Sequence, residues 1–325
     1  MRHTIAILSI IATMAGFPVP AGAQWPERAI KVVVPFPAAI AYDKIITDAL
    51  AEKLGVPVYL EIVPGAGGTI ALQRMMESPA DGYTLGHGAG PNMILSLWKH
   101  PPYDPLNMTV IGPTTAFPPP VLFVRKSYKG SLKDFVEEAR KTGSEISWGS
   151  GNRNTASMAG LQFLSLAGIK GATLVPSSPA SGANQSLIEV LAGRYAFGVE
   201  AGSFVLPQTA EGGGLRVLTV LSNRRHWMFP DVPTPQEAGL QGNFELYVMN
   251  CFLSPKGTPP EIVLRLRQAL YEVMSNADVE KRLRVIYNEP IVVPPEQMET
   301  RVRQWLTTET NNWNRIIEKN GLPLQ

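Results

Sequence analysis

Short apolar runs alternate with amphipathic stretches along most of this chain, and the two kinds of run predict different elements. Residues 31–36 form the first apolar run and predict a buried strand. Residues 43–54 predict a helix, because Ile46, Leu50 and Leu54 recur on one face and Gly55 follows as a C-terminal stop. The alternation continues with strands expected at residues 58–63, 83–85, 121–124, 145–149, 173–176, 196–200, 215–221 and 244–253, and helices at 131–142 (with Ser131 as N-cap), 155–167 and 184–191. This order favours an α/β fold with a parallel sheet and crossover helices.

After residue 255 the pattern becomes helical. Thr258 precedes two prolines, which is typical of an N-cap followed by proline in the first turn. A helix is expected to begin there, and further helices are expected at 278–285 and 295–320, with Gly321 as the last stop. The long final helix is predicted to bury an apolar face made of Met298, Val302, Trp305 and Ile316.

The elements suggest two lobes. We expect residues 24–124 and 248–325 to form one lobe and residues 125–247 to form the other. The chain would then cross between them twice, near residues 122–126 and within the long extended run at 244–255. Two crossing segments would allow the lobes to close on a small molecule.

The first residues read as a secretory signal peptide. A basic start, Met1-Arg2-His3, is followed by an apolar stretch at 4–14 and by the small-x-small pattern Ala21-Gly22-Ala23. We expect cleavage after Ala23 and export of residues 24–325 to the periplasm; an uncleaved membrane anchor is the alternative. The residue directly after the cleavage site is Gln24 and not cysteine, which argues against a lipoprotein.

Composition narrows the possible functions. Removing residues 1–23 takes one Arg and no acid from 29 basic and 27 acidic residues, which leaves 28 against 27. This near-neutrality argues against a nucleic-acid partner or a polybasic membrane surface. Cys251 is the one cysteine, so no intramolecular disulfide forms, and its apolar surroundings predict a buried, inert thiol. His87, His100 and His226 lie far apart in sequence without metal-ligand spacing.

Enzyme motifs are scarce. Gly65-x-Gly67-Gly68 is followed by Ile70 where a dinucleotide fingerprint needs glycine. Neither a phosphate-binding Gly-x-x-x-x-Gly-Lys-Ser/Thr loop nor a Gly-x-Ser-x-Gly elbow is present. A Ser–His–acid triad stays open, because triads are spatial. We expect no enzyme activity and no cofactor.

Eight short motifs, in order along residues 24–325, resemble those of the extracytoplasmic solute receptors of tripartite tricarboxylate transporters, the Bug or TctC-like family. They are Trp25-Pro26, Pro35-Phe36-Pro37-Ala38-Ala39-Ile40-Ala41-Tyr42-Asp43, Val63-Pro64-Gly65-Ala66-Gly67-Gly68, Ala80-Asp81-Gly82-Tyr83-Thr84-Leu85, Pro102-Tyr103-Asp104-Pro105-Leu106, Gly149-Ser150-Gly151-Asn152, Pro230-Asp231-Val232-Pro233-Thr234-Pro235-Gln236-Glu237-Ala238-Gly239 and Pro255-Lys256-Gly257-Thr258-Pro259. Each motif alone is weak, but their order and spacing make chance resemblance improbable.

The resemblance implies a fold and a function. The fold would be periplasmic-binding-protein-like, with two Rossmann-like lobes and a ligand cleft between them. The protein would capture a small carboxylate and pass it, unchanged, to the large and small membrane subunits of a transporter, as a monomer without metal or cofactor. The alternative is a periplasmic sensor that presents its bound form to a receptor kinase.

The resemblance also implies a set of ligand-binding residues. Carboxylate oxygens would be held largely by backbone N–H groups at helix N-termini, which carry partial positive charge. In the first lobe the residues are Phe36, Ala38, Ala39, Ile40, Tyr42, Asp43, Gly67, Gly68, Gly88 and Ala89. In the second lobe they are Ser150, Gly151, Arg153, Asn154, Thr155, Ser178, Ser181 and Glu200. For Asp43 and Asn154 helix capping is the alternative role, and for residues 64–69 it is a tight turn that needs glycine.

This sequence departs from the family pattern in three places. Ala39 and Ile40 replace two loop glycines, the loop at 177–182 is longer than its family counterpart, and Arg153 stands where a small residue is usual. Fewer available amides and more apolar surface predict an aromatic or apolar mono- or dicarboxylate, with Phe117 or Trp148 adding to the wall. Arg153 would pair with a ligand carboxylate, or would be a solvated surface residue. Glu200 would disfavour a second anionic group nearby, or would favour a ligand amine.

Overall fold

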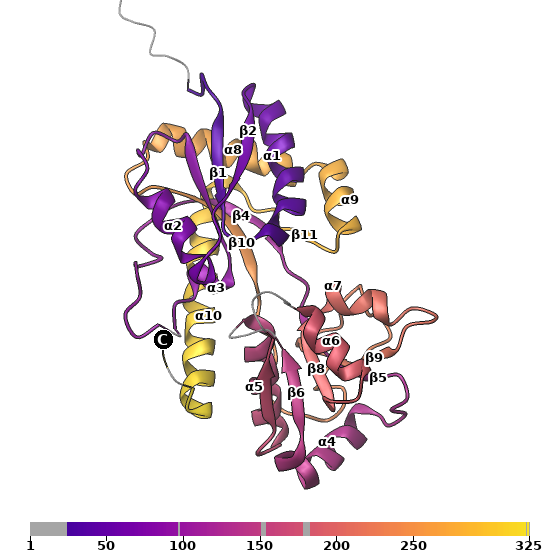
Figure 1. The fold of residues 1–325 in the computed structure, drawn as a ribbon. Coiled ribbons are helices and arrows are strands. Elements are labelled where there is room, and N and C mark those ends of the chain that lie inside the picture. The colour runs from indigo at the N-terminus through magenta and orange to yellow at the C-terminus, as the bar shows by residue number, and fades with distance from the viewer. Residues whose placement is uncertain (1–24, 97, 151–153, 178–182, 323, 325) are drawn as a thin grey trace, which may run out of the picture.

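The computed structural model describes residues 25–96, 98–150, 154–177, 183–322 and 324, and within them the strands form two separate sheets (Figure 1). The first sheet has the order β11-β4-β10-β3-β1-β2, and the second has the order β7-β6-β8-β5-β9. The strands of the first sheet are β1 (Ile30–Val34), β2 (Val58–Ile62), β3 (Thr84–Gly88), β4 (Thr109–Ala116), β10 (Met249–Ser254) and β11 (Glu289–Pro290). Those of the second are β5 (Pro120–Arg125), β6 (Ser147–Ser150), β7 (Thr173–Pro176), β8 (Phe197–Ala201) and β9 (Leu215–Val220).

Helices cover these sheets, which confirms the predicted α/β class (Figure 1). They are α1 (Ile40–Leu54), α2 (Thr69–Met76), α3 (Gly90–Met93), α4 (Leu132–Thr142), α5 (Thr155–Ala167), α6 (Ala183–Leu191), α7 (Gly202–Val205), α8 (Pro260–Met274), α9 (Ala277–Val285) and α10 (Met298–Asn320). On the first sheet, α1, α8 and α9 share one apolar cluster with Phe252 of β10, whereas α2 and α10 share another with Cys251. Successive residues of β10 therefore point to opposite faces, as the strand period requires.

The strand β10 lies in the middle of the first sheet although it follows the whole second sheet in sequence. It pairs antiparallel with β3 on one side and β4 on the other, and all six of its residues are buried. The run at 244–253 was expected to be one strand, but only β10 pairs, and residues 244–248 belong to no strand or helix. The strand β4 was not predicted, because its central Gly-Pro-Thr-Thr lacks an apolar pattern.

We call the first sheet with its helices the first lobe, and the second sheet with its helices the second lobe. The chain passes between them at residues 117–119 and 244–248, and these segments lie side by side because the N–H of Phe117 donates to the carbonyl of Val248 at 3.0 Å. The predicted boundary at residue 124 would leave β5 in the first lobe, but β5 pairs with β8 and β9. Strand pairing thus puts the first crossing before β5, and the exact lobe limits stay a prediction.

Helix ends follow their local signals at most positions. Gly55 and Gly321 adopt left-handed backbone at the ends of α1 and α10, as expected. The side chain of Ser131 accepts a hydrogen bond from Asp134, which confirms it as the N-cap of α4. The prediction for Thr258 was wrong: Pro259 is the N-cap of α8, and the Thr258 hydroxyl donates to the carbonyl of Pro255 at 2.8 Å.

The long helix α10 lies along the first lobe and reaches the second (Figure 1). Its predicted inner face is confirmed, since Met298, Val302, Trp305 and Ile316 are all buried. The indole N–H of Trp305 also donates to the carbonyl of Tyr247 at 2.7 Å. This bond ties α10 to the second crossing segment, and the helix therefore braces the junction of the lobes.

The core of the second lobe contains an aromatic stack. Trp148 is fully buried and its ring lies parallel to that of Phe197, with centroids 5.4 Å apart and an interplanar angle of 4°. The suggestion that Trp148 adds to a ligand wall was therefore wrong, because burial removes it from any surface. The absence of a side chain at Gly160 on α5 makes room for this ring.

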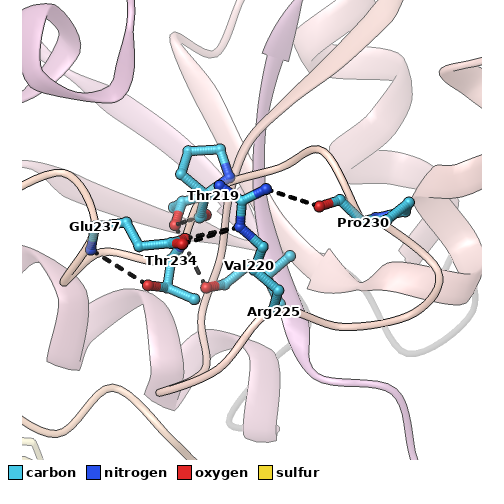
Figure 2. Close-up of polar contacts among 7 residues, drawn as sticks. Thr219, Val220, Arg225, Pro230, Thr234 and Glu237 are labelled. Atoms are coloured by element: carbon cyan, nitrogen blue, oxygen red, sulfur yellow. Dashed lines mark hydrogen bonds and ion pairs between the residues drawn. The ribbon is translucent and has the colours of Figure 1, made fainter.

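The motif at residues 230–239 has a structural role that its sequence did not reveal (Figure 2). Thr234 and Glu237 form a reciprocal turn, in which the Thr234 N–H donates to the Glu237 carboxylate at 2.8 Å and the Glu237 N–H donates to the Thr234 hydroxyl at 3.3 Å. Arg225 donates to the same carboxylate at 2.9 Å, and also to the carbonyl of Pro230 at 2.8 Å. The Thr219 hydroxyl donates to the carbonyl of Pro233 at 2.9 Å, so this loop is fastened to β9.

Substituting Gly160 by Ala separates helix propensity from packing. Propensity alone predicts a gain of about 1 kcal/mol in a helix interior. However, the new Cβ would lie 2.4 Å from Cη2 and Cζ3 of Trp148, and overpacking of this kind costs about 1–3 kcal/mol. We expect Gly160→Ala to lower the free energy of unfolding in urea. The matched background is Trp148→Phe, which lacks those two atoms; an equal loss in both backgrounds would contradict the packing explanation.

The turn at Glu237 predicts a pH-dependent contribution to stability. The Thr234 N–H, chiefly, and Arg225 hold the pKa of Glu237 below its ordinary value of 4.5. A carboxyl group whose pKa is depressed by folding stabilises the protein above its unfolded pKa, and the contribution disappears as pH falls through the folded pKa. Wild type should therefore exceed Glu237→Gln in unfolding free energy at neutral pH. Denaturation at a series of lower pH values should show the difference shrinking below about pH 4; a constant difference would exclude this origin.

Candidate functional site

Three loops of the first lobe meet at one edge of its sheet. The strands β1, β2 and β3 run parallel, so their carboxyl ends lie together, where α/β proteins bind ligands. Gly68 shows how closely the loops approach: a Cβ there would lie 2.8 Å from Cζ of Phe36 and 3.2 Å from Cβ of Asn92. Gly68 and Gly67 also have positive φ angles of 93° and 65°. Both glycines are therefore required by backbone geometry, which supports the tight-turn interpretation of residues 64–69.

The loop after β1 is a single tight turn that leads directly into α1. Residues 37–39 form a 3-10 turn. The N–H of Ala39 donates to the carbonyl of Phe36 at 2.9 Å, and the N–H of Ile40 donates to the carbonyl of Pro37. Ile40 has φ −53° and ψ −42°, ordinary right-handed values that need no glycine. The amides of Ala39 and Ile40 are thus used inside the turn, as their replacement of glycine led us to expect. Ala38 belongs to the same turn.

Asp43 is not a helix cap. It lies within the first turn of α1, whose N-cap is Ala39, and it is fully buried beside His87. Nδ1 of His87 lies 2.8 Å from Oδ2 of Asp43. Neither side chain forms a hydrogen bond of good geometry with any other described residue. This pair couples α1 to β3 beneath the loops. The capping prediction for Asp43 was wrong because a partner distant in sequence determines the position of its side chain.

Tyr42 packs over this pair and extends it toward the lobe junction. Its ring centroid lies 5.9 Å from that of His87 and 6.3 Å from that of Phe117 in an edge-to-face contact. Burial, reinforced by the Asp43 charge, raises the pKa of Tyr42 well above its ordinary value. Tyr42 therefore stays neutral, and its ring joins the candidate site to the first crossing segment.

In the third loop, which follows β3, backbone groups form hydrogen bonds with the side chain of Asn92. The N–H of Ala89 donates to Oδ1 of Asn92 at 2.7 Å, and Nδ2 of Asn92 donates to the carbonyl of His87 at 3.0 Å. A Cβ on Gly88 would lie 2.8 Å from Sγ of Cys251, so Gly88 faces the core. Burial raises the pKa of Cys251 to about 12, which confirms a buried, unreactive thiol.

Sequence reasoning missed Asn92 and His87 as structural members of this site. Asn92 lacked a clear signal, because a capping box pairs a Ser or Thr N-cap with Glu or Gln three residues later, and Ala89 stands at this N-cap. No local signal existed for His87, whose position inside β3 resembles that of an ordinary core residue.

In the second lobe, α5 begins where the sequence predicted. Asn154 is its N-cap: Oδ1 accepts from the N–H of Ser157 at 2.9 Å, and the Asn154 N–H donates to Oγ of Ser157 at 3.0 Å. Ser150, buried at the end of β6, donates its hydroxyl to the carbonyl of Val199 at 2.7 Å. The side chains of Asn154 and Ser150 therefore have structural partners, and the capping role proposed as the alternative for Asn154 is observed.

The start of α5 faces the first lobe. A Cβ on Gly90, the first residue of α3, would lie 3.4 Å from Oγ1 of Thr155 and 3.8 Å from Cγ1 of Val248. Thr155 is the first residue of α5, so the N-terminus of a second-lobe helix meets the loop after β3 beside the second crossing segment. This contact between the lobes is the central geometric feature of the candidate site.

Glu200 lies at the end of β8 but is directed toward α6. Its side chain is only 2 % exposed, and Oε1 accepts a hydrogen bond from the Ser186 hydroxyl at 2.8 Å. Four other predicted contacts, Gly151, Arg153, Ser178 and Ser181, lie outside the described residues.

In the part of the chain that the structure describes, no group of three or more His, Cys, Asp or Glu side chains has a metal-binding arrangement. In that same part, no helix combines the length and the apolar character needed to span a membrane.

Comparisons with known proteins agree with this geometry. The family model for the "Tripartite tricarboxylate transporter family receptor" matches residues 43–322. Protein BugT of Bordetella pertussis is 27% identical over 333 residues, covering 100% of this chain and 99% of its own. MatC (Rpa3494) from Rhodopseudomonas palustris with bound malate is 26% identical, with a TM-score of 0.73 over 90% of this chain and 100% of its own. R. palustris Rpa4515 with adipate is 25% identical, with a TM-score of 0.78 over 93% and 100%.

Removing one partner of the buried Asp43–His87 pair should destabilise the protein. A buried polar group left without its partner costs about 1–3 kcal/mol. We expect a loss of this size for Asp43→Ala in urea unfolding, and a loss in the Asp43→Ala/His87→Ala double variant that is smaller than the sum of the single losses. The neighbouring control is Lys44→Ala, which breaks only the exposed 2.9 Å ion pair with Asp48 and should cost about 0.5 kcal/mol or less. Fully additive losses would contradict the pairing.

Proposed function

This chain belongs to the family of tripartite tricarboxylate transporter receptors, and we propose that it captures a small organic carboxylate between its two lobes. The ligand would be delivered unchanged to the large and small membrane subunits of a tripartite tricarboxylate-type transporter. We infer that residues 1–23 are a cleaved signal peptide, that the protein acts as a monomer in the periplasm, and that it needs neither a cofactor nor a catalytic group.

The observation that carries the proposal is the meeting of the α5 N-terminus with the first-lobe loops at Gly90 and Thr155. The first N–H groups of a helix lack intrahelical acceptors and carry partial positive charge. In α5 the N–H of Ser157 is used by the cap and that of Met158 by the carbonyl of Asn154. We therefore assign the N–H groups of Thr155 and Ala156 as donors to a ligand carboxylate.

We further propose that the ligand has a hydrocarbon or aromatic part. The similar proteins described with malate and adipate both hold dicarboxylates, which supports a carboxylate as the ligand. On the first-lobe side the amides of Ala39 and Ile40 are consumed by their own turn, whereas the side chains of Phe36, Ile40 and Phe117 are half-buried. Apolar side chains on the first-lobe side, together with a helix N-terminus from the second lobe, fit a carboxylate that carries a chain or ring better than they fit citrate.

A thermal-shift series on the purified protein tests both the binding of a carboxylate and the preference for a ligand with an apolar part. A ligand at 100 times its Kd stabilises the native state by about 2.7 kcal/mol, so Tm should rise by several degrees. We expect benzoate or adipate to raise Tm more than malate or citrate does. A rise with citrate alone would keep receptor function and overturn the apolar preference. A flat response to a broad panel of mono-, di- and tricarboxylates would count against carboxylate capture.

The Ile40→Gly variant tests the apolar wall directly. This change restores the residue usual in the family and removes a half-buried side chain. We expect titration calorimetry to show weaker binding of adipate or benzoate, with malate affected less. The control is Leu264→Ala on α8, where the residue is 62% exposed and shares a surface pocket with Leu54, at the opposite end of α1 from Ile40. Equal losses for all acids in Ile40→Gly would point to a folding effect instead.

A further inference from the structure

The turn after α9 contains a tyrosine where glycine is the usual residue. Tyr287 has φ +60°, and Ala66 is the other non-glycine residue with positive φ among the described residues. The N–H of Tyr287 donates to the carbonyl of Arg284, and that of Asn288 donates to Leu283, both at 3.0 Å. This pair of bonds is the Schellman arrangement that ends many helices, and its left-handed position favours glycine or asparagine. The bulky side chain of Tyr287 thus adds backbone strain that a glycine would avoid.

The Tyr287 ring reaches out of its own lobe. The turn belongs to the first lobe, because Glu289 and Pro290 of β11 pair with Ala116 and Thr115 of β4. The half-buried ring nevertheless packs against an apolar cluster of the second lobe. That cluster includes Val121 and Phe123 of β5, Val217 of β9 and Phe229.

The polar contacts beside Tyr287 also join the lobes, but they are long. Nε2 of His226 in the second lobe lies 3.7 Å from Oε1 of Glu289 in the first. Nη1 of Arg284, which belongs to the first lobe like Glu289, also lies 3.7 Å from that oxygen. The Arg284 guanidinium carbon lies 5.6 Å from the centre of the Trp227 ring. Partly exposed ion pairs at this distance contribute little. The Tyr287 ring adds apolar packing to these long contacts on this side of the junction.

The Tyr287 contact lies next to the crossing segments, where it can limit rotation of one lobe against the other. The pairing of Glu289 with Ala116 puts the turn at the end of β4, directly before the crossing segment at 117–119. In Figure 1, α10 lies on one side of the crossing segments, and α9 with β11 lies on the other. α10 shares an apolar cluster with α5 of the second lobe. The lobes are thus joined on both flanks of the crossings, by α10 on one flank and by Tyr287 on the other.

We propose that Tyr287 is an interlobe strut that limits how far the lobes rotate about the crossing segments. Its strained backbone is retained because the ring must project from a helix end into the other lobe. Removing the ring leaves the long contacts of His226 and Arg284 on one flank of the junction, while the bond between Trp305 and Tyr247 continues to hold the other. The relative orientation of the lobes then becomes more variable.

Spin labels can measure this variability in the ligand-free, full-length protein. Exposed Glu52 on α1 and Glu137 on α4 provide one site in each lobe as E52C and E137C, and buried Cys251 does not compete for label. Pulsed dipolar spectroscopy then gives the distance distribution between the lobes. We expect Tyr287→Phe to match wild type, and Tyr287→Gly and Tyr287→Asn both to broaden the distribution.

The three variants separate the ring from the backbone. Gly and Asn both suit a left-handed position, so the turn is kept, and Asn is less flexible than Gly. Wild-type distributions in both variants would overturn the proposal, and broadening in Gly alone would assign the effect to backbone freedom. Broadening in Phe would assign the tie to the hydroxyl group and overturn the packing argument. Because no ligand is present, a failed carboxylate screen leaves this test unaffected.

Discussion

The insertion of β10 between β3 and β4 is the constraint on which the rest of the structure depends. Without this strand the first sheet would separate into β11-β4 and β3-β1-β2. Because β10 follows the second lobe, the chain must leave and re-enter the first lobe at neighbouring points. The hydrogen bond from Phe117 to Val248 joins those two points. This arrangement holds the start of α5 beside Gly90, which follows β3.

The polar groups of the candidate site are largely committed to the protein itself. The amides of Ala39 and Ala89, the hydroxyl of Ser150 and the cap of Asn154 all have internal partners. Such commitment makes the loops rigid before a ligand arrives, which reduces the entropy lost on binding. Under the proposed function, the first amides of α5 and the apolar side chains of the first-lobe loop would then be the main groups that meet the ligand.

Local signals in the sequence predicted much of the fold and less of the site. The helix α5 begins at 155 and ends at 167 as expected, because Asn154 and Gly168 act within a single turn. The strand β4 escaped prediction because its Gly-Pro-Thr-Thr segment becomes core only when β10 covers it. Asp43 was misassigned as a cap because its partner, His87, lies on a different element. At the site, the loops and helix ends were predicted better than the distant residues that orient their side chains.

The sequence by itself determined the family, the alternation of strands and helices, and the glycine positions that end helices. The family followed from the resemblance, order and spacing of the short motifs. The alternation of elements and the helix ends follow from periodicity and from hydrogen bonds that close within one turn, so nearby residues suffice to specify them. Only the tertiary structure decided that β5 belongs to the second sheet, that Thr155 faces Gly90, and that Tyr287 packs on the other lobe. These contacts join residues far apart in the chain, and their geometry exists only once both sheets have formed and the crossing segments lie side by side.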